Sequence, residues 1–144
     1  MPAEILQLTD FHLMADPEAA LKGVPTRDSL MEVLAYVDEG VQAGKWRFDH
    51  VVITGDMAHD EQLETYESLR ELLGQWTSRC SLIPGNHDNR DCIRQAFPQL
   101  VPQRSPADGV FLNFSLAVAN WRLIGLDSHV DGEVAGHLDG RQLK

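Results

Sequence analysis

Short apolar runs alternate along this chain with longer stretches in which apolar residues recur at the spacing of a helix. Three of the runs predict buried strands, over residues 4–8, 50–54 and 81–83. Amphipathic patterns over residues 26–43 and 63–76 predict the helices between them. Because strand, helix, strand, helix, strand is the order of parallel crossover units, the pattern predicts an α/β fold built on a parallel sheet.

The pattern changes after the third predicted strand. A brief helix is expected over residues 91–97, and prolines mark a loop after it. Two β-prone runs, at residues 110–118 and 121–127, are separated by Ala119-Asn120. Two such runs around a two-residue turn predict a β-hairpin.

The length and composition are those of one domain. A chain of 144 residues with 43% hydrophobic residues is long enough to bury a core, and 24% charged residues is ordinary for a folded protein. Residues 139–144 have the pattern of a helix that is just beginning, with Asp139 as its cap. Because domains rarely end at such a point, we expect residues 1–144 to form a single, truncated domain.

The charge and the apolar runs argue against some classes of partner. A formal net charge of −10 disfavours a surface that binds nucleic acid or an anionic membrane, because both need clustered lysine and arginine. The chain begins without the basic region and long apolar stretch of a secretion signal, and no apolar run approaches membrane length. Its two cysteines, Cys80 and Cys92, do not form a Cys-x-x-Cys pair. We therefore expect a cytoplasmic protein with reduced thiols, and neither a nucleic acid nor a membrane as its partner.

Polar segments with metal-binding side chains follow all three predicted strands. They are Asp10-Phe11-His12, Gly55-Asp56 and Gly85-Asn86-His87-Asp88. Because parallel strands end at the same edge of a sheet, we expect these segments to lie together. Asp10 and His12 offer one oxygen and one nitrogen to a cation. Asp56 has two oxygens that can bridge two cations, Asn86 offers a carbonyl oxygen, and this mixture of ligands suits manganese, iron or zinc.

Each of these segments also has an ordinary explanation. An isolated Asp-x-His pair is common by chance, Gly-Asp after a strand is usually a turn, and Gly-Asn-His-Asp can be a turn with an Asx cap. Their order after three successive strands favours a metal site. Within such a site we expect His87 to protonate a departing alkoxide, and Asp88 to hold His87 in one tautomer. We expect Asp60 to orient a loop or cap the following helix.

The remaining histidines leave several alternatives open. His59 lies three residues after Asp56, so it is either at the rim of the pocket or on the solvated surface. His129 follows the second β-prone run and is placed to approach a substrate. His50 opens a strand and is expected to be a boundary residue, and we do not expect a ligand role for His137.

The polar segments resemble the first three motifs of the calcineurin-like metallophosphoesterases. More narrowly, they resemble the bacterial class III cyclic-AMP phosphodiesterases. The residues that carry the resemblance are Leu6-Gln7-Leu8-Thr9-Asp10-Phe11-His12, Thr54-Gly55-Asp56-Met57-Ala58-His59-Asp60 and Leu82-Ile83-Pro84-Gly85-Asn86-His87-Asp88. Further similarity lies in Leu21-Lys22-Gly23-Val24, Leu126-Asp127-Ser128 and Gly136-His137-Leu138. The resemblance covers essentially the whole chain.

The resemblance implies a fold and a set of site residues. The fold would be the first half of a four-layer α/β/β/α sandwich, with a sheet edge and an apolar face left for a missing segment or a partner to cover. Asp10 and His12 would bind the first metal, and Asp56 would bridge both metals. Asn86 would bind the second metal, and His87 would contact the phosphate or serve as the acid. The remaining ligands of the family are histidines from two later motifs, which this chain lacks.

The resemblance also implies an activity. We expect hydrolysis of 3′,5′-cyclic AMP, or a related cyclic nucleotide, to the 5′-monophosphate by a hydroxide that bridges two divalent ions, with manganese or iron first and zinc next. One alternative is a broader phosphodiesterase that acts on substrates such as glycerophosphodiesters. Another is a non-catalytic fragment that needs a missing C-terminal segment, a completing chain or a second copy in a homo-oligomer.

Overall fold

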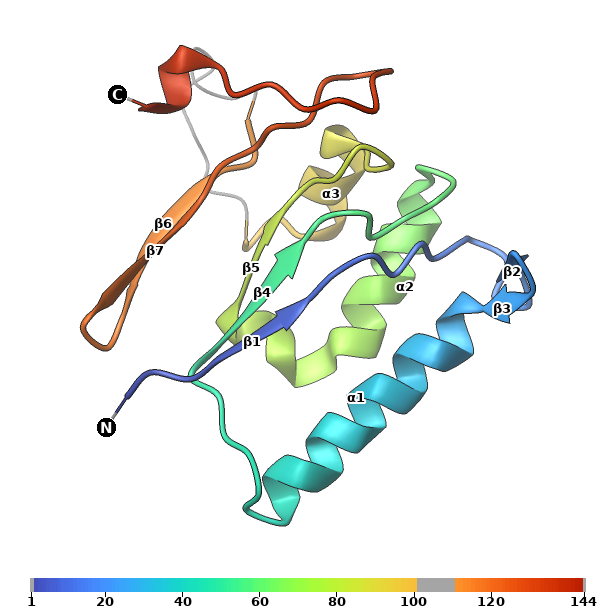
Figure 1. Cartoon of the computed structure of the whole chain (residues 1–144). Coiled ribbons are helices and arrows are strands. Elements are labelled where there is room, and N and C mark those ends of the chain that lie inside the picture. Colours follow the sequence, from blue (N-terminus) through green and yellow to red (C-terminus); the bar gives the residue numbers. More distant parts are fainter. Residues whose placement is uncertain (1, 101–110, 144) are drawn as a thin grey trace.

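The computed structural model describes residues 2–100 and 111–143 of the chain. Three parallel strands form its central sheet in the order β1-β4-β5 (Figure 1). Their bounds are Ile5–Leu8 for β1, His50–Thr54 for β4 and Cys80–Ile83 for β5. The register places Ile53 beside both Leu8 and Leu82, so the three strands end together. The predicted α/β fold with a parallel sheet is confirmed.

The helices follow the predicted crossover pattern. They are α1 (Thr26–Gln42), α2 (Leu63–Leu73), the 3₁₀ helix η1 (Gly74–Arg79) and α3 (Arg90–Ala96). In Figure 1, α1 and α2 lie to one side of the sheet. Leu30 and Leu34 of α1 are buried, whereas Val33, at the margin of the same stripe, is 47% exposed. The stripe that covers the core is therefore narrower than the apolar pattern of this helix suggests.

The core is built between the central strand and α2. Val51 and Ile53 alternate along β4 with half-buried residues, and both are fully buried. Tyr66 and Leu69 of α2 lie in the same buried cluster, as does Trp76 of η1. This packing fixes the strand ends relative to α2. The loops that follow the strands therefore start from fixed positions.

A hairpin lies on the other side of the sheet from α1 and α2 (Figure 1). Its strands, β6 (Phe114–Val118) and β7 (Trp121–Gly125), pair in antiparallel fashion with Val118 opposite Trp121. The two-residue turn that this register leaves confirms the predicted hairpin. Val110, where the first run was expected to begin, lies outside the described residues.

Two small elements complete the described chain. A short antiparallel pair, β2 (Ala20–Leu21) and β3 (Val24–Pro25), was not predicted. Lys22 and Gly23 between them both have positive φ, at 52° and 84°, as the turn of a two-residue hairpin requires. Near the C-terminus, η2 (Gly140–Leu143) is a single 3₁₀ turn, and the predicted cap, Asp139, accepts a hydrogen bond from the Arg141 amide at 2.8 Å.

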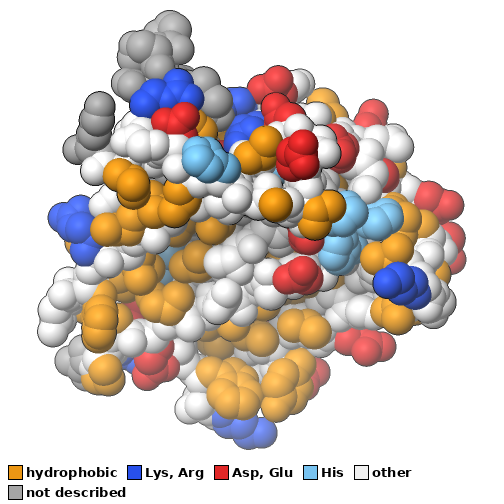
Figure 2. Space-filling view, turned by 45° about the horizontal axis from the view of Figure 1, so that its top comes forward, with side chains coloured by type: hydrophobic (Ala, Val, Ile, Leu, Met, Phe, Trp, Pro, Cys, Tyr) orange, Lys and Arg blue, Asp and Glu red, His pale blue; other side chains and the backbone are white. Residues whose placement is uncertain are grey.

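Several large apolar side chains remain on the surface. Figure 2 shows apolar side chains spread over one face, with a group of histidines and acidic side chains beside them. The exposed apolar residues include Val24, Val33, Trp121 and Ile124. No helix in the described part of the chain is both long enough and apolar enough to cross a membrane.

Candidate metal centre

The loops after β1 and β4 continue to pair beyond the ends of the strands. The Asp10 amide donates to the Gly55 carbonyl at 3.1 Å, and the His12 amide donates to the Asp56 carbonyl at 2.9 Å. Leu13 then forms an isolated parallel bridge with Ala58. Because this pairing fixes the two loops to each other, the side chains of Asp10, His12 and Asp56 have a defined separation.

Two glycines let the second and third loops come into contact. A Cβ added at Gly55 would lie 2.7 Å from the Gly85 backbone, and Gly55 also has a φ of +98°. A Cβ added at Gly85 would lie 2.1 Å from Oδ1 of Asp56. Atoms cannot approach that closely, so the glycine of each motif is needed to bring Asp56 against the third loop.

The backbone is strained at the predicted ligands. Asp10, His12 and Asp56 have φ values of 58°, 45° and 50°, in the left-handed region that residues with a side chain rarely adopt. Such conformations persist only where surrounding contacts enforce them, and they concentrate at functional sites. Here the hydrogen bonds between the loops supply the enforcing contacts.

The three side chains converge on one point. Nε2 of His12 lies 3.9 Å from Oδ1 of Asp10 and 3.6 Å from Oδ2 of Asp56. One ligand atom from each residue lies within 4.8 Å of the others. Among the described residues, no lysine or arginine pairs with either carboxylate. Two carboxylates and an imidazole without a basic partner form a donor set that a divalent cation would neutralise, so these residues fit a metal ion.

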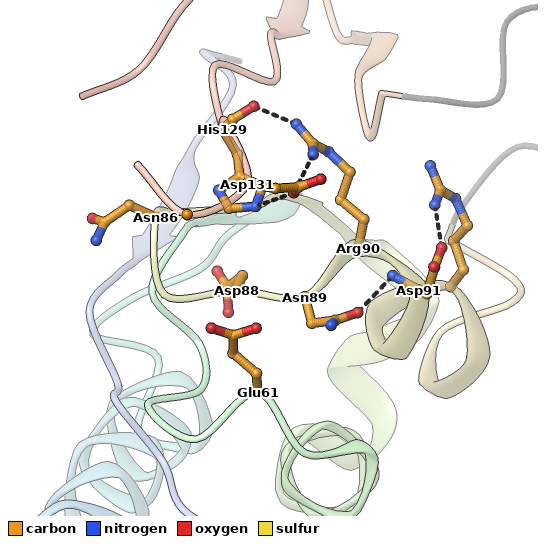
Figure 3. A pocket seen from close by; sticks show the side chains of 10 residues that line it. Glu61, Asn86, Asp88, Asn89, Arg90, Asp91, His129 and Asp131 are labelled. Atoms are coloured by element: carbon orange, nitrogen blue, oxygen red, sulfur yellow. Dashed lines mark hydrogen bonds and ion pairs between the residues drawn. The ribbon is translucent and has the colours of Figure 1, made fainter. Parts of the chain in front are cut away.

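Asn86 lies at the border of two cavities. It lines a cavity of about 280 Å³ together with Asp10 and Asp56. It also lines a cavity of about 410 Å³ with Arg90 and His129. In Figure 3 its side chain points away from Asp88 and Glu61. Within the described part of the chain, no hydrogen bond holds its carboxamide. Its oxygen is therefore available to a cation on the carboxylate side.

Asp88 does not hold His87, and that expectation is wrong. Its side chain is 1% exposed and accepts hydrogen bonds from four donors. These are the amides of Met57, Ala58 and Gly85, at 3.0, 3.1 and 2.8 Å, and the hydroxyl of Tyr66, at 3.1 Å. Burial raises the pKa of Asp88, and the four donors act in the opposite direction. Asp88 thus ties the second loop to the third beneath the site, because its side chain points into the core.

Tyr66 extends this tie into α2. Its hydroxyl donates to Asp88 and accepts a hydrogen bond from the Asn89 amide at 2.8 Å. Burial, followed by the nearby Asp88 carboxylate, raises the pKa of Tyr66 well above its usual value of 10.0. The hydroxyl therefore stays protonated and can serve as donor and acceptor at once.

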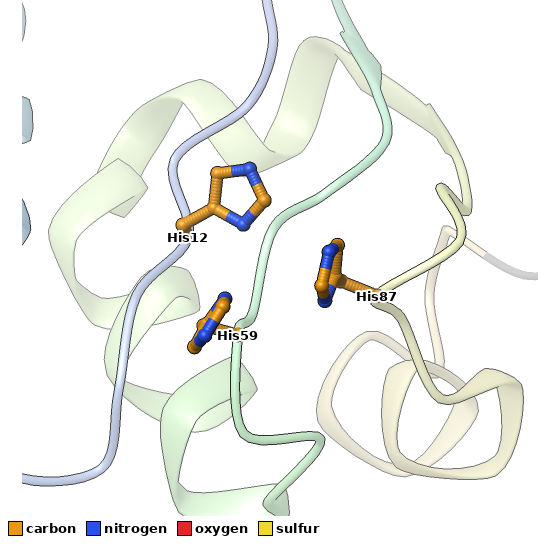
Figure 4. A group of neighbouring side chains, drawn as sticks. All are labelled: His12, His59 and His87. Carbon is orange, nitrogen blue, oxygen red and sulfur yellow. The ribbon is translucent and has the colours of Figure 1, made fainter. Parts of the chain in front are cut away.

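His87 and His59 lie next to His12. The His87 amide donates to Oδ1 of Asp56 at 3.1 Å, and its ring centroid lies 5.1 Å from that of His12. The His59 ring is half-buried and stacks on His87 at 5.0 Å with an interplanar angle of 26° (Figure 4). His59 therefore lies half-buried beside the predicted site residues His12 and His87, and not on the fully solvated surface. The pairing of Leu13 with the second loop, which places His59 there, has no signal in the sequence.

Asp60 performs the first of the two roles expected for it, the orientation of a loop, whereas the N-cap residue of α2 is Gln62. Its Oδ2 accepts a hydrogen bond from the Ala15 amide at 2.6 Å, which orients the first loop. Its Oδ1 accepts from Oγ1 of Thr65 at 2.7 Å and from the Gln62 amide at 3.2 Å, at the start of α2. Asp60 therefore supports the loops from outside the ligand cluster.

The other histidines lie apart from the cluster. Nε2 of His50 lies 2.9 Å from Oγ of Ser81, as expected of a residue at a strand boundary. His129 pairs with Asp131 at 2.9 Å and lines both cavities. His137 is exposed and belongs to neither of the described groups that could hold a metal ion.

Arg90 and Asp127 fasten the hairpin segment beside the larger cavity. Nε of Arg90 lies 2.8 Å from Oδ2 of Asp127, and Nη2 lies 3.0 Å from Oδ1. Asp127 is fully buried and also accepts from the Leu112 amide at 2.8 Å. Arg90 further donates to the His129 carbonyl and to Asp131 (Figure 3). This guanidinium is committed to the protein, so it is a structural anchor for the wall of the cavity.

Comparison with known proteins identifies relatives of the whole described chain. A family model described as calcineurin-like phosphoesterase matches residues 3–142. The chain is 34% identical over 140 residues to the 3′,5′-cyclic adenosine monophosphate phosphodiesterase CpdA of Vibrio vulnificus, and 35% identical over 140 residues to the protein of that name from Escherichia coli. Each alignment covers 97% of this chain and 47% of the relative.

A third relative gives a similar picture. A probable cyclic nucleotide phosphodiesterase of Synechococcus is 30% identical over 143 residues, which is 99% of this chain and 51% of that protein. The chain therefore spans about half the length of the curated relatives it matches.

Proposed function

This chain belongs to the calcineurin-like phosphoesterase family, and on that premise we propose that it contributes the metal-binding strand ends of a phosphodiesterase that hydrolyses 3′,5′-cyclic AMP. The observation that carries the proposal is the convergence of Asp10, His12 and Asp56, in strained backbone, at the ends of adjacent parallel strands. The choice of cyclic AMP is supported by the names of two relatives, which are called 3′,5′-cyclic adenosine monophosphate phosphodiesterases.

We assign the ligand roles that the family resemblance implies, and the geometry and the donor types are compatible with them. Asp10 and His12 would hold one divalent ion, and Asp56 would contact both ions because its two oxygens face different neighbours. Asn86 would hold the second ion through its carbonyl oxygen. Members of this family use divalent metals, and a set of oxygen and imidazole donors suits Mn²⁺ or Fe²⁺, with Zn²⁺ next. When bound, such ions would neutralise phosphate charge and supply hydroxide at neutral pH.

His87 is the proposed proton donor. Its ring lies beside His12 and its amide is fixed to Asp56, so His87 is held next to the proposed metal ligands. Opening of the cyclic ester releases the 3′ oxygen of the ribose as an alkoxide. Transfer of a proton from the His87 imidazole to that oxygen would complete the 5′-monophosphate product.

The surroundings of the site are part of the proposal. Both cysteines are free thiols, which favours the cytoplasm. The exposed apolar side chains, among them Trp121 and Ile124, favour further protein surface against this half of the fold, supplied by a longer chain or a second copy. That surface would also provide the metal ligands that the resemblance assigns to later motifs.

The test is hydrolysis of cyclic AMP by the chain after removal of metals, with and without added Mn²⁺, against the Asp56→Asn variant. The proposal predicts release of 5′-AMP that depends on Mn²⁺ and is lost in the variant. Faster turnover of a glycerophosphodiester under the same conditions would support the broader phosphodiesterase instead. Failure of the chain to hydrolyse either substrate would favour the non-catalytic alternative and reject the activity for this polypeptide.

A further inference from the structure

Three histidines from three different loops face one another beside the carboxylate cluster. His12 follows β1, His59 follows β4 and His87 follows β5, and their rings surround a common space (Figure 4). The ring centroid of His12 lies 5.5 Å from that of His59 and 5.1 Å from that of His87. One nitrogen from each of the three rings lies within 4.8 Å of the others. We call these three residues the histidine cluster.

Two ring nitrogens of this cluster are buried and unpaired within the described structure. Nε2 of His12 faces the carboxylates of Asp10 and Asp56, which leaves Nδ1 on the other side of the ring. Nδ1 of His12 and Nδ1 of His59 are both buried without a hydrogen-bond partner in the described structure. Buried polar atoms are seldom left unpaired, and a bound ion is one of the usual reasons for an exception.

The backbone holds the histidine cluster independently of any ion. The His12 amide donates to the Asp56 carbonyl at 2.9 Å, and the His59 amide donates to the Leu13 carbonyl at 2.8 Å. The His87 amide donates to Oδ1 of Asp56 at 3.1 Å. Each ring therefore projects from a fixed point, and coordination would require rotation of side chains without movement of the loops.

We propose that His12, His59 and His87 form a second cation site, made only of imidazole nitrogens, that takes Zn²⁺ or a neighbouring late first-row ion. Three imidazoles and one open position form a common zinc environment, with Zn–N distances of about 2.0–2.1 Å. Tetrahedral geometry at that distance places the nitrogens about 3.4 Å apart, so the rings close inward from their present separation. Mn²⁺ and Mg²⁺ prefer oxygen donors and are expected to bind at the carboxylates instead.

The two sites share His12 and compete for it. A neutral imidazole has one nitrogen lone pair, so His12 can ligate an ion in only one of the sites at a time. Zn²⁺ in the histidine cluster would remove His12 from the carboxylate site and engage His87 as well. Inhibition of hydrolysis by excess Zn²⁺ is therefore a consequence that rests on the proposed function, whereas the cation site itself does not.

The test is direct measurement of ion binding to the full chain, without an activity readout. Zn²⁺ binding is followed by titration calorimetry, and coordination by the visible absorption of Co²⁺ as a zinc substitute. The variants are His59→Gln and His87→Gln, with His137→Gln as the matched control because His137 is an exposed histidine outside the cluster. Asp56→Asn removes a carboxylate but keeps an oxygen to accept the His87 amide.

The proposal predicts one Zn²⁺ whose dissociation constant rises at least about tenfold in His59→Gln and in His87→Gln, since loss of a direct ligand exceeds the effect of an outer contact. The four-coordinate Co²⁺ spectrum is lost with it. Zn²⁺ affinity is unchanged in His137→Gln and is kept in Asp56→Asn. Unchanged affinity in the two cluster variants, or a loss confined to Asp56→Asn, would overturn the proposal. Circular dichroism checks that each variant is folded. If one of the two cluster variants does not fold, the other is sufficient for the test.

Discussion

Among single residues, Asp56 connects the carboxylate site with the histidine cluster. Its Oδ2 lies 3.6 Å from Nε2 of His12, and its Oδ1 accepts the His87 amide at 3.1 Å. The left-handed backbone at this residue costs energy, and the glycines at 55 and 85 allow it. The residue is therefore held in place by the fold before any ion binds.

Among the residues that are not ligands, we expect replacement of Tyr66 to destabilise the protein most. Tyr66→Phe deletes a fully buried hydroxyl, which leaves the Asn89 amide without its partner and removes one of the three donors to Oδ1 of Asp88. We expect a loss of about 1–3 kcal/mol in the free energy of unfolding, measured by urea denaturation.

Tyr36→Phe is the matched control, because Tyr36 is 63% exposed. Its effect is expected to stay within about 0.5 kcal/mol. Equal losses in the two variants would show that the buried hydroxyl does not support the loops.

The identities of the ligand candidates could be predicted from the sequence, but their surroundings could not. Asp10 and Asp56 stand directly after apolar runs, and the rule that parallel strands end together brings them to one edge. His59 joins the cluster through backbone pairing beyond the strands, and Asp88 turns inward to bond three amides. Neither effect has a pattern in the order of apolar and polar residues.

Among the secondary-structure elements, the hairpin is attached to α3 through the ion pair of Arg90 with Asp127. Arg90 at the start of α3 makes two hydrogen bonds to the buried Asp127, just after β7. Arg90→Lys keeps the charge but cannot reproduce the paired geometry. We expect a loss of at least about 1.5 kcal/mol in the free energy of unfolding and faster hydrogen exchange in β6 and β7.

Arg122→Lys is the control for that change. Arg122 is exposed and donates to Oγ of Ser115 within the hairpin itself. Its replacement should leave exchange in β6 and β7 near the rate of the unchanged protein. Slow exchange in the hairpin of Arg90→Lys would mean that other contacts fasten it.

His50 leads us to expect that the pairing of β4 with β5 depends on pH. Burial, and then the charge of Arg79, lowers the pKa of His50 from its usual 6.5. Below that pH the unfolded chain takes up a proton that the folded chain refuses, so the free energy of unfolding falls as the pH falls. Between about pH 7.5 and about pH 5.5, the unchanged protein should lose more stability than His50→Gln in urea denaturation. A steeper loss in the variant would contradict this account.

The elements themselves could largely be predicted, since periodicity and turn residues are local signals. The strands at 50–54 and the helix from residue 26 begin where the pattern indicated. The pair of β2 and β3 escaped prediction because each strand has two residues, too few to show an alternating pattern. The left-handed conformation of Lys22 and Gly23, which makes this turn, is seen only in the structure.

At the scale of the whole molecule, one buried cluster among residues 2–100 and 111–143 links the sheet, both long helices and α3. A single core predicts one cooperative unfolding transition, in keeping with the expectation of a single domain. Tryptophan fluorescence, which reports on the buried Trp76 together with the exposed Trp46 and Trp121, and far-ultraviolet circular dichroism should give the same midpoint in urea. Two separate midpoints would show that the chain does not unfold as one cooperative unit.

The relatives are about twice as long as this chain, so we compare what the described residues contain with what further protein surface would add. The described half of the fold carries the strand ends and the loops that position Asp10, His12, Asp56 and Asn86. It also carries exposed apolar residues such as Trp121 and Ile124. Metal affinity is therefore expected to reside in this chain, and added protein surface is expected to increase it.

The most direct test of the central claim is Mn²⁺ binding to this chain, measured by equilibrium dialysis and elemental analysis, beside Asp56→Asn. The account predicts binding that weakens at least about tenfold in Asp56→Asn, while the circular dichroism spectrum stays the same. His137→Gln should bind as the unchanged protein does. Equal Mn²⁺ affinity with and without the Asp56 carboxylate would contradict the claim that the ends of the parallel strands form the metal site.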